Sequence, residues 1–361
     1  MERKHILIIV PSFDIGGAQK IGSFIAGNLS RDGSEVSLIG LERGDNLLKV
    51  DPSVGQYSFK NYDVYNTSKI KKIGYAIKLR MLIKKLKPDA VIIFGTLVVA
   101  YLAVLGLRMP IMGCERGDPN SYNRKLRSRV VRAYKRFSIL TFQTPMARDG
   151  YPELADKKSY VIPNPCFLAD SDNEVTEINR KKEVVSVGRL VEEKGYEMLI
   201  RAFVSIHHLH PEYKLIIYGD GPQKELLANL IAENEASEYV FLPGKTDKVK
   251  QNIQNASLFV LSSDYEGIPN TLLEAMCLGV PVVTTDCSPG GARFLTKDGS
   301  IGGLLIPVRD EKKMADAIDK MLSDRCFAEE MAKKGLSVNA DYSPETIYRL
   351  WKQAINVLIC I

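Results

Sequence analysis

The stretch LFVLSSDYEGIPNTLLEAMCLGVPVV, residues 258–283, carries the pattern that decides the fold. Its apolar start, Leu258–Leu261, predicts a buried strand, and a turn containing Gly267 and Pro269 follows. Proline is tolerated in the first turn of a helix, so the segment from Asn270 predicts a helix that starts there. The apolar run Val282–Thr284 then predicts another strand. A strand, a helix and a strand in succession are typical of a parallel sheet.

The same alternation continues in both directions. Further strands are predicted at 6–10, 36–41, 90–94, 111–114, 140–143, 160–162, 184–187, 215–218, 240–242 and 304–306. In the first half, helices are predicted at 18–29, 68–86, 97–107 and 124–137. Such a pattern predicts an α/β fold with two doubly wound, Rossmann-like domains that face each other across a cleft. We expect domains at 1–165 and 183–343, a polar and acidic linker at 166–182, and a C-terminal helix within 344–361 that packs on either domain.

The composition agrees with two soluble domains. The chain has 361 residues, of which 45% are hydrophobic and 25% charged, and these values exclude wholesale disorder and a disulfide-stapled miniprotein. The net charge of +6 divides unevenly, because residues 1–170 carry +12 and the remainder −6. This asymmetry predicts that the two halves meet different partners.

Neither targeting nor membrane insertion is indicated. The apolar run near the N-terminus is too short for a signal peptide, and six cysteines without a C-x-x-C pair suit free thiols in a reducing cytoplasm. Ala90–Leu107 lacks charge over 18 residues, the lower limit for a membrane span. Because Gly95 divides it, we favour a buried strand followed by a buried helix.

Residues 258–283 contain two glutamates, Glu266 and Glu274, that could contact a ligand. Glu266 precedes the predicted helix and Glu274 lies about one turn inside it, so both side chains can reach the helix N-terminus. The free N–H groups of a helix N-terminus suit a phosphate. Carboxylates instead suit the hydroxyl groups of a sugar. The segment therefore predicts a ligand that contains both a phosphate and a sugar.

Several loops after strands add to this site. Arg189 and Lys194 lie between a strand and a helix and carry charges that bind phosphate. Glycine turns follow other strands, at Gly219, beside Pro243, and at Gly16 and Gly17, where the backbone can approach a ligand closely. The early turn lacks the G-x-G-x-x-G pattern, which argues against an NAD-dependent oxidoreductase.

Together these motifs resemble the family-4 type retaining glycosyltransferases of the two-domain GT-B fold, over nearly the whole chain and most strongly from Val184 to Leu295. The resemblance implies that Arg189 and Lys194 bind the donor diphosphate, that Glu274 binds the nucleotide ribose, and that Glu266 contacts the donor sugar. It also implies that the early glycine turn closes over the phosphates. Backbone groups of the turn after Glu266 would contact sugar and phosphate, at Ile268, Pro269, Asn270, Thr271 and Leu272.

A narrower resemblance, to bacterial enzymes that extend lipid-linked or capsular polysaccharides, lies in Cys114–Pro119 and Thr285–Gly291. It implies acceptor-side roles for Arg116 and Asp118. Related sequences have Asn where this chain has Gly117. A purely structural alternative, in which Asp118 is the N-cap of a helix, is equally compatible with the sequence.

The function implied is transfer of a hexose or N-acetylhexosamine, with retention, from a nucleotide sugar that we expect to be UDP-linked. The acceptor would be a growing, lipid-linked cell-surface glycan. We expect neither a metal ion nor a cofactor beyond the nucleotide sugar. Two alternatives remain: a sugar-nucleotide 2-epimerase on the same fold, and a non-catalytic relative. A non-catalytic relative would be expected to have lost the donor residues, which are all present here: Arg189, Lys194, Glu266 and Glu274.

Two basic segments indicate a further partner. Lys69–Lys87 has eight Lys and Arg residues and Arg124–Arg136 has seven, and neither segment has an acidic residue. Both suit either a solvated helix face or an anionic membrane surface. The absence of an aromatic-basic pattern argues against nucleic acid. We therefore expect a cytoplasmic protein, peripheral on the inner face of the membrane.

Overall fold

The computed structural model describes residues 3–14, 16–42, 48–59, 68–95, 98–168 and 180–361. The chain divides into two compact units, residues 1–163 with 347–361, and residues 164–346. Most of the predicted linker, residues 169–179, lies outside the described residues. Its predicted end at residue 182 is wrong, because strand β8 already begins at Lys181.

Unit 1 is built on a seven-stranded sheet in the order β3-β2-β1-β4-β5-β6-β7, in which every neighbouring pair is parallel. Its central strands β1 and β4 are fully buried, which explains why residues 6–10 and 90–94 are uninterrupted apolar runs. The strands are β1 (His5–Val10), β2 (Glu35–Glu42), β3 (Gly55–Phe59), β4 (Ala90–Phe94), β5 (Ile111–Cys114), β6 (Ile139–Phe142) and β7 (Ser159–Val161).

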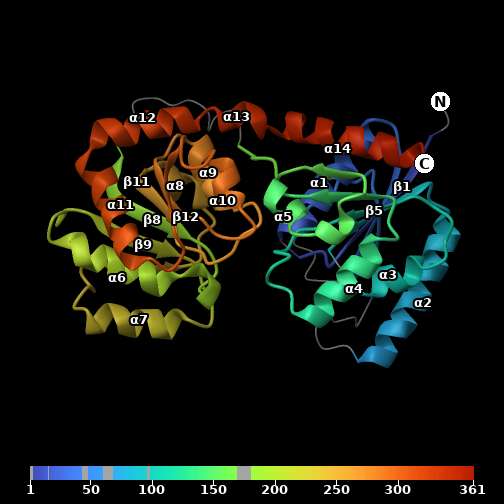
Figure 1. Ribbon diagram of the computed structural model, residues 1–361, viewed down its shortest axis with the longest axis horizontal. Coiled ribbons are helices and arrows are strands. Elements are labelled where there is room, and N and C mark those ends of the chain that lie inside the picture. Colours follow the sequence, from blue (N-terminus) through green and yellow to red (C-terminus); the bar gives the residue numbers. More distant parts are fainter. Residues whose placement is uncertain (1–2, 15, 43–47, 60–67, 96–97, 169–179) are drawn as a thin grey trace. The chain divides into compact units, whose positions relative to one another are not determined.

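Helices connect these strands (Figure 1). They are α1 (Gly17–Arg31), α2 (Lys69–Leu86), α3 (Val98–Val104), α4 (Arg124–Tyr134) and α5 (Pro145–Asp149), followed by a 3₁₀ turn at Pro152–Leu154. Helices α2, α3, α4 and α5 share one core with the sheet. Side chains cap α2, α4 and α5: Ser68 accepts from the Lys71 N–H, Asn123 from the Leu126 N–H, and Thr144 from the Ala147 N–H. Strand β3 was missed by the sequence analysis because it is a half-exposed edge strand with a polar sequence, GQYSF.

Unit 2 repeats the design with a six-stranded parallel sheet in the order β10-β9-β8-β11-β12-β13. The strands are β8 (Lys181–Val187), β9 (Lys214–Tyr218), β10 (Val240–Gly244), β11 (Ala256–Leu261), β12 (Val282–Thr285) and β13 (Gly303–Ile306). Every strand predicted in this half is present, with ends that differ by up to three residues.

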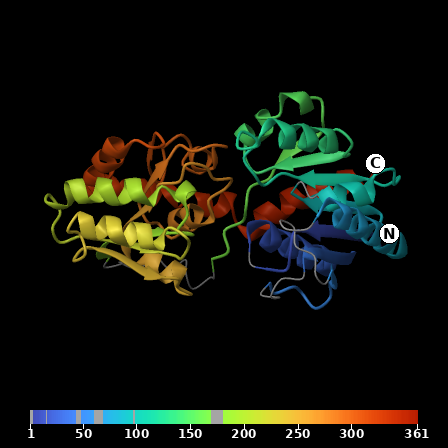
Figure 2. The same ribbon diagram turned by 90° about the horizontal axis from the view of Figure 1, so that it is seen from below.

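The helices of unit 2 continue the alternation. Helices α6 and α7 lie side by side on one face of the sheet (Figure 2). The elements are a 3₁₀ turn at Glu192–Lys194, α6 (Tyr196–His207), α7 (Lys224–Glu233), α8 (Val249–Gln254), α9 (Asn270–Cys277), α10 (Gly291–Leu295), α11 (Glu311–Ser323), α12 (Arg325–Gly335) and α13 (Val338–Asp341).

Both strand orders reverse direction once. The reversal lies between β1 and β4 in unit 1 and between β8 and β11 in unit 2. In open α/β sheets, ligands bind at this point, outside the carboxyl ends of the strands. We therefore expect a ligand to bind at the loops that follow these strands.

The uncharged stretch 90–107 forms strand β4 and helix α3, as predicted, and both are part of the unit 1 core. None of the helices in the described parts of the chain combines the length and the apolar character needed to cross a bilayer.

The last helix, α14 (Pro344–Ile359), returns the chain to unit 1 and lies along α1 (Figure 1). The Tyr348 hydroxyl and the Lys352 ammonium group both bind the Asp32 carboxylate, at 2.7 Å. Trp351 is completely buried beside Phe94 of β4, with 5.8 Å between ring centroids. The sequence left open which domain this helix joins, and these contacts settle it for residues 347–361.

Candidate functional site

The loops after β8 and β11 meet at the reversal point of unit 2. Lys194, which ends the loop after β8, forms an ion pair with Glu266, which lies in the loop after β11. Both side chains are about one-fifth exposed, so water screens the pair only in part. The Ser263 hydroxyl also donates to Glu266 Oε1, at 3.2 Å. Two residues predicted from separate motifs therefore form one cluster.

Further hydrogen bonds fix these two loops to each other. The Ser262 hydroxyl donates to the Lys194 carbonyl oxygen at 2.7 Å, and the Asp264 N–H donates to the Glu193 carbonyl oxygen at 2.8 Å. No sequence pattern pointed to these serines, because the hydrogen bond of Ser262 depends on a loop about 70 residues away. These hydrogen bonds tie the loop that carries Lys194 to the loop that carries Glu266.

Arg189 is held less firmly. Its side chain is 78% exposed and its closest carboxylate is Glu193, with 3.7 Å between Nη2 and Oε1. An exposed pair of this kind contributes little free energy, so the guanidinium group is able to reorient toward an anion.

The turn at Gly219 brings a third strand end to the site. Gly219 has a φ of +155°, and a Cβ atom there would lie 1.8 Å from the Gly188 carbonyl oxygen, so only glycine fits. The Gly219 N–H donates to the Gly244 carbonyl oxygen at 2.9 Å, next to the exposed Pro243 at the end of β10. The predicted glycine turns of unit 2 thus lie at one edge of the sheet, together with Arg189 and Lys194.

Helix α9 presents its N-terminus at the same edge. It starts at Asn270 after the N-cap Pro269, whose side chain makes no capping hydrogen bond. The side chains of Ile268 and Leu272 are buried, so these residues can offer only backbone groups to a ligand. Thr271 is partly exposed, and the amide oxygen of Asn270 accepts a hydrogen bond from the Asn164 side chain at 2.9 Å.

Glu274 follows one helical turn after Asn270 and is partly buried. Its negative charge contributes to the raised pKa of the Cys277 thiol, after the larger effects of a hydrogen bond with Cys166 and burial. The loop after β12 also lies at this edge of the sheet. There the Glu266 N–H donates to the Ser288 carbonyl oxygen at 2.9 Å. Among the described residues, no three His, Cys, Asp or Glu side chains gather in a group suited to a metal ion.

In unit 1, the predicted early glycines begin helix α1. Gly17 is its first residue and Gly16 its N-cap, in the loop after β1. This loop follows one of the two strands at the reversal point of the sheet, which is the place that topology assigns to a ligand.

In the loop that follows β5, Asp118 is buried and Arg116 is partly buried. The Arg116 guanidinium carbon lies 5.3 Å from the ring centroids of Phe94 and Trp351, and burial lowers the pKa of this arginine to about 10. Asp118 accepts from the Asn120 N–H at 2.8 Å and closes a local turn. It is not a helix N-cap, since α4 begins after Asn123.

Glu115, to which the sequence analysis gave no role, organises this loop. Within the described residues, the buried carboxylate accepts hydrogen bonds from the Arg116 and Gly117 N–H groups, at 2.8 Å each. Three tyrosine hydroxyls also donate to it at 2.7 to 3.1 Å, from Tyr122, Tyr134 and Tyr151. Burial raises the pKa of all three tyrosines, so the hydroxyls stay protonated as donors. The three tyrosines are scattered over residues 122–151, and no sequence pattern joins them to Glu115.

Gly117, the departure from the related motif, has a reason within this cluster. A Cβ atom at this position would lie 2.4 Å from the Tyr122 hydroxyl oxygen. A side chain here would displace Tyr122 from Glu115, so the glycine and the tyrosine belong together.

Comparisons with known proteins show which families and structures this chain is similar to. The sequence model of the family "Glycosyl transferases group 1" matches residues 169–338. The "Amylovoran biosynthesis glycosyltransferase AmsD" of Erwinia amylovora is 23% identical, and the alignment covers 98% of this chain and 99% of that protein. A Campylobacter jejuni enzyme, named as an alpha-1,4-N-acetyl-D-galactosaminyltransferase, is 26% identical over 97% of this chain and 98% of its own length.

The fold is also that of solved glycosyltransferase structures. Anabaena Alr3699/HepE, solved in complex with UDP and glucose, superposes with a TM-score of 0.78 at 19% identity, covering 98% of this chain and 100% of that one. Two parallel sheets of seven and six strands, each with its helices, match this GT-B architecture. The family model over residues 169–338 and the relatives aligned over nearly their whole length make this chain similar to group 1 glycosyltransferases, and its fold is of the GT-B type.

Proposed function

We propose that the protein transfers a hexose or N-acetylhexosamine from a UDP-linked sugar to a growing, lipid-linked cell-surface glycan, with retention at the anomeric carbon. The observation that carries this proposal is the Lys194–Glu266 pair at the reversal point of unit 2, beside the N-terminus of α9. Cation, carboxylate and helix terminus together suit a ligand that has both a diphosphate and a sugar.

Two named relatives support the choice of donor and acceptor. The Campylobacter enzyme is named for an acceptor glycan joined through PP to undecaprenol, and the Anabaena structure holds UDP and glucose. We assign the donor diphosphate to Arg189, Lys194 and the backbone of residues 268–272, the ribose to Glu274, and the sugar to Glu266.

In the proposed reaction, the bond from the anomeric carbon to the diphosphate breaks while the acceptor oxygen forms its new bond on the same face of the sugar. The acceptor hydroxyl gives its proton to the leaving diphosphate oxygen, so no protein base is required. Lys194 and Arg189 stabilise the negative charge that develops on the leaving group. Because Ser263 also donates to Glu266, that carboxylate keeps a partner when Lys194 turns to the phosphate.

These cations and the α9 N-terminus supply the positive charge that a metal ion supplies in other transferases. We therefore propose that the reaction needs neither a metal ion nor a cofactor besides the nucleotide sugar. Undiminished transfer in the presence of EDTA is the expected result, and loss of activity that Mg²⁺ restores would refute this part.

The acceptor side is assigned to unit 1, in the loop held by Glu115. Since Arg116 is enclosed by Phe94 and Trp351, we assign it a positioning role and not direct contact with the acceptor. Asp118, in the same loop, remains the proposed polar contact.

A membrane surface is the second proposed partner. Helix α2 exposes Ile70, Ile73, Ile77 and Met81, each more than half exposed, at intervals of three and four residues that place them on one face. Exposed lysines alternate with this stripe, among them Lys71, Lys78 and Lys84. Apolar side chains flanked by cations suit the surface of an anionic bilayer, and we place the protein at the inner face of the cytoplasmic membrane.

The test is product analysis with the purified protein, a panel of nucleotide sugars and lipid-linked acceptors, with NMR of the new linkage. The expected product has the anomeric configuration of the donor, and Lys194→Ala should form none. A product with the inverted anomeric configuration would refute the proposed retention and leave the proposed transfer intact. Conversion of the nucleotide sugar to an epimer without any acceptor would instead support the isomerase alternative, and the absence of any turnover would refute transfer.

A further inference from the structure

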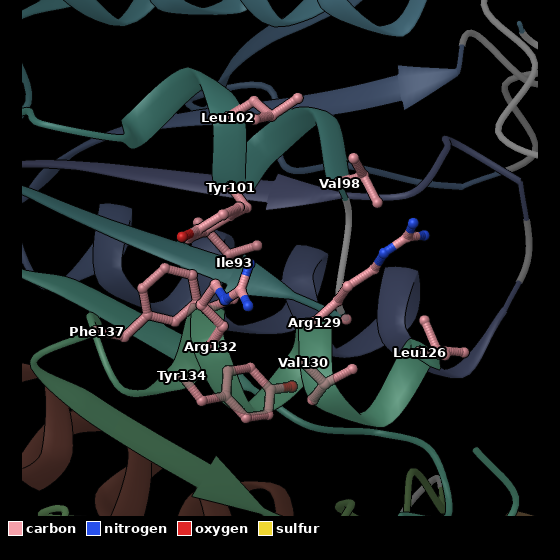
Figure 3. A pocket seen from close by; sticks show the side chains of 12 residues that line it. Ile93, Val98, Tyr101, Leu102, Leu126, Arg129, Val130, Arg132, Tyr134 and Phe137 are labelled. Atoms are coloured by element: carbon pink, nitrogen blue, oxygen red, sulfur yellow. The ribbon is translucent and has the colours of Figure 1, made fainter. Parts of the chain in front are cut away.

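A pocket with a cavity of about 180 Å³ lies between helices α3 and α4, over the carboxyl end of β4 (Figure 3). Figure 3 shows the rings of Tyr101, Phe137 and Tyr134 on one side and Val98, Arg129 and Leu126 on the other. Helix α4 and the residues after it form one wall and α3 the opposite wall, and Ile93 and Gly95 at the end of β4 also line the pocket.

The lining favours an apolar ligand. Val98, Leu102, Leu126, Val130 and Phe137 contribute hydrocarbon. Apolar cavities of roughly this size stay dry and bind small hydrocarbons such as benzene. A sugar would lose hydrogen bonds to water here without replacing them, so the pocket is unsuited to a glycan.

Two cations belong to the same pocket. Arg129 and Arg132 line it, and within the described part of the chain neither forms an ion pair with a carboxylate. They belong to the acid-free segment Arg124–Arg136. An apolar cavity bordered by two guanidinium groups is complementary to an amphiphile whose hydrocarbon chain starts at a phosphate.

The pocket is also connected to the proposed acceptor loop. The ring of Tyr134 lines the cavity, and its hydroxyl donates to Glu115 Oε2 at 3.1 Å. Glu115 in turn accepts the N–H groups of Arg116 and Gly117. One side chain therefore joins the cavity wall to the loop that carries Asp118.

We propose that this pocket binds the isoprenoid unit next to the diphosphate of a prenyl-linked acceptor, while Arg129 and Arg132 bind its phosphates. The inference rests on the proposed lipid-linked acceptor and names the part of that lipid which unit 1 recognises. It differs from membrane docking by α2, because the ligand enters a cavity and does not lie on a helix face.

The test compares geranyl diphosphate with inorganic diphosphate by calorimetry, with excess UDP present to occupy the donor site. The wild type should bind the prenyl compound at least tenfold more tightly. Val98→Trp should remove this difference by filling the pocket. Leu105→Trp is the matched control, since Val98 and Leu105 are 45% and 42% exposed and only Val98 lines the cavity. Arg129→Gln should weaken both ligands, and Lys135→Gln, from the same basic segment, should weaken neither.

Equal binding of geranyl diphosphate by the two tryptophan variants would overturn the proposal, as would equal binding of the two ligands by the wild type. Association with anionic phospholipid vesicles that changes in Val98→Trp, without a change in geranyl diphosphate binding, would also overturn it. Transfer to an acceptor analogue without a lipid chain should be the same in Val98→Trp and in the wild type. That assay reports on the proposed function separately from the pocket.

Discussion

The ammonium group of Lys194 pairs with the carboxylate of Glu266, although 72 residues separate them in the chain. The pairing exists because β8 and β11 are neighbours at the point where the strand order of unit 2 reverses. The cation that we propose for the leaving phosphate and the carboxylate that we propose for the sugar thus lie at one place before a donor binds. In the absence of a donor, each of the two charges compensates the other.

Lys194→Ala should lower the rate of transfer by about 10²- to 10³-fold, because a charge that stabilises the leaving group is lost. The measurement is steady-state kinetics, with circular dichroism to verify the fold. Lys182→Ala is the control, since Lys182 forms an exposed pair with Glu212 at 3.3 Å in the same unit. If both variants lose the same fraction of the transfer rate, the assignment of Lys194 to the donor site is refuted.

Glu274→Gln should raise the KM for the nucleotide sugar by roughly 10- to 100-fold, the effect of weakening a charge-assisted hydrogen bond to a hydroxyl. Binding of UDP alone, measured by calorimetry, should weaken by the same factor if the ribose is the group recognised. Glu329→Gln, in an exposed pair with Arg325, serves as the control. An unchanged affinity for UDP together with a lowered kcat would show that Glu274 contacts the reacting sugar and not the ribose.

Tyr134→Phe should lower the free energy of unfolding by about 2 kcal/mol, because it deletes a hydrogen bond to the buried carboxylate of Glu115. Urea denaturation measures this loss. The double variant Tyr134→Phe/Tyr151→Phe should lose more or less than the sum of the single variants, since both hydroxyls bind Glu115 Oε2. Strict additivity would show that the two hydrogen bonds act independently.

Ile73→Ser combined with Ile77→Ser should reduce binding to anionic vesicles by about tenfold, because both side chains belong to the exposed apolar stripe of α2. Vesicle sedimentation measures the change, and transfer to a soluble acceptor analogue should stay at the wild-type level. Leu226→Ser, which removes an exposed leucine from unit 2, should leave sedimentation unchanged. If wild type and double variant sediment equally, α2 is not the membrane contact.

Raising the pH above 9 should destabilise the fold. Burial raises the pKa of Cys114 to about 11 and that of Cys287 to about 12, from an ordinary value of 9.0. The unfolded chain loses these thiol protons first, so the native state holds more protons between pH 9 and 12 and its stability falls as pH rises. Thermal unfolding of Cys114→Ala should show a shallower decline over this range than the wild type, and parallel curves would contradict the assignment.

The sequence by itself determined the alternation of strands and helices. Fully buried parallel strands such as β4 and β5 have to be continuous apolar runs, so their bounds were predicted to the residue. It also identified Lys194, Glu266 and Glu274 as candidates, because each lies beside a strand end or a helix start. The half-exposed strand β3 left no such pattern.

Only the tertiary structure decided which residues meet. It paired Lys194 with Glu266 and gathered Tyr122, Tyr134 and Tyr151 around Glu115. It also enclosed Arg116 between Phe94 and Trp351, a residue 235 positions further along the chain. Local propensity depends on neighbours along the chain, whereas these contacts depend on strand order and on the return of α14 to unit 1. A pattern in one sequence therefore predicts the elements, and packing alone assigns their partners.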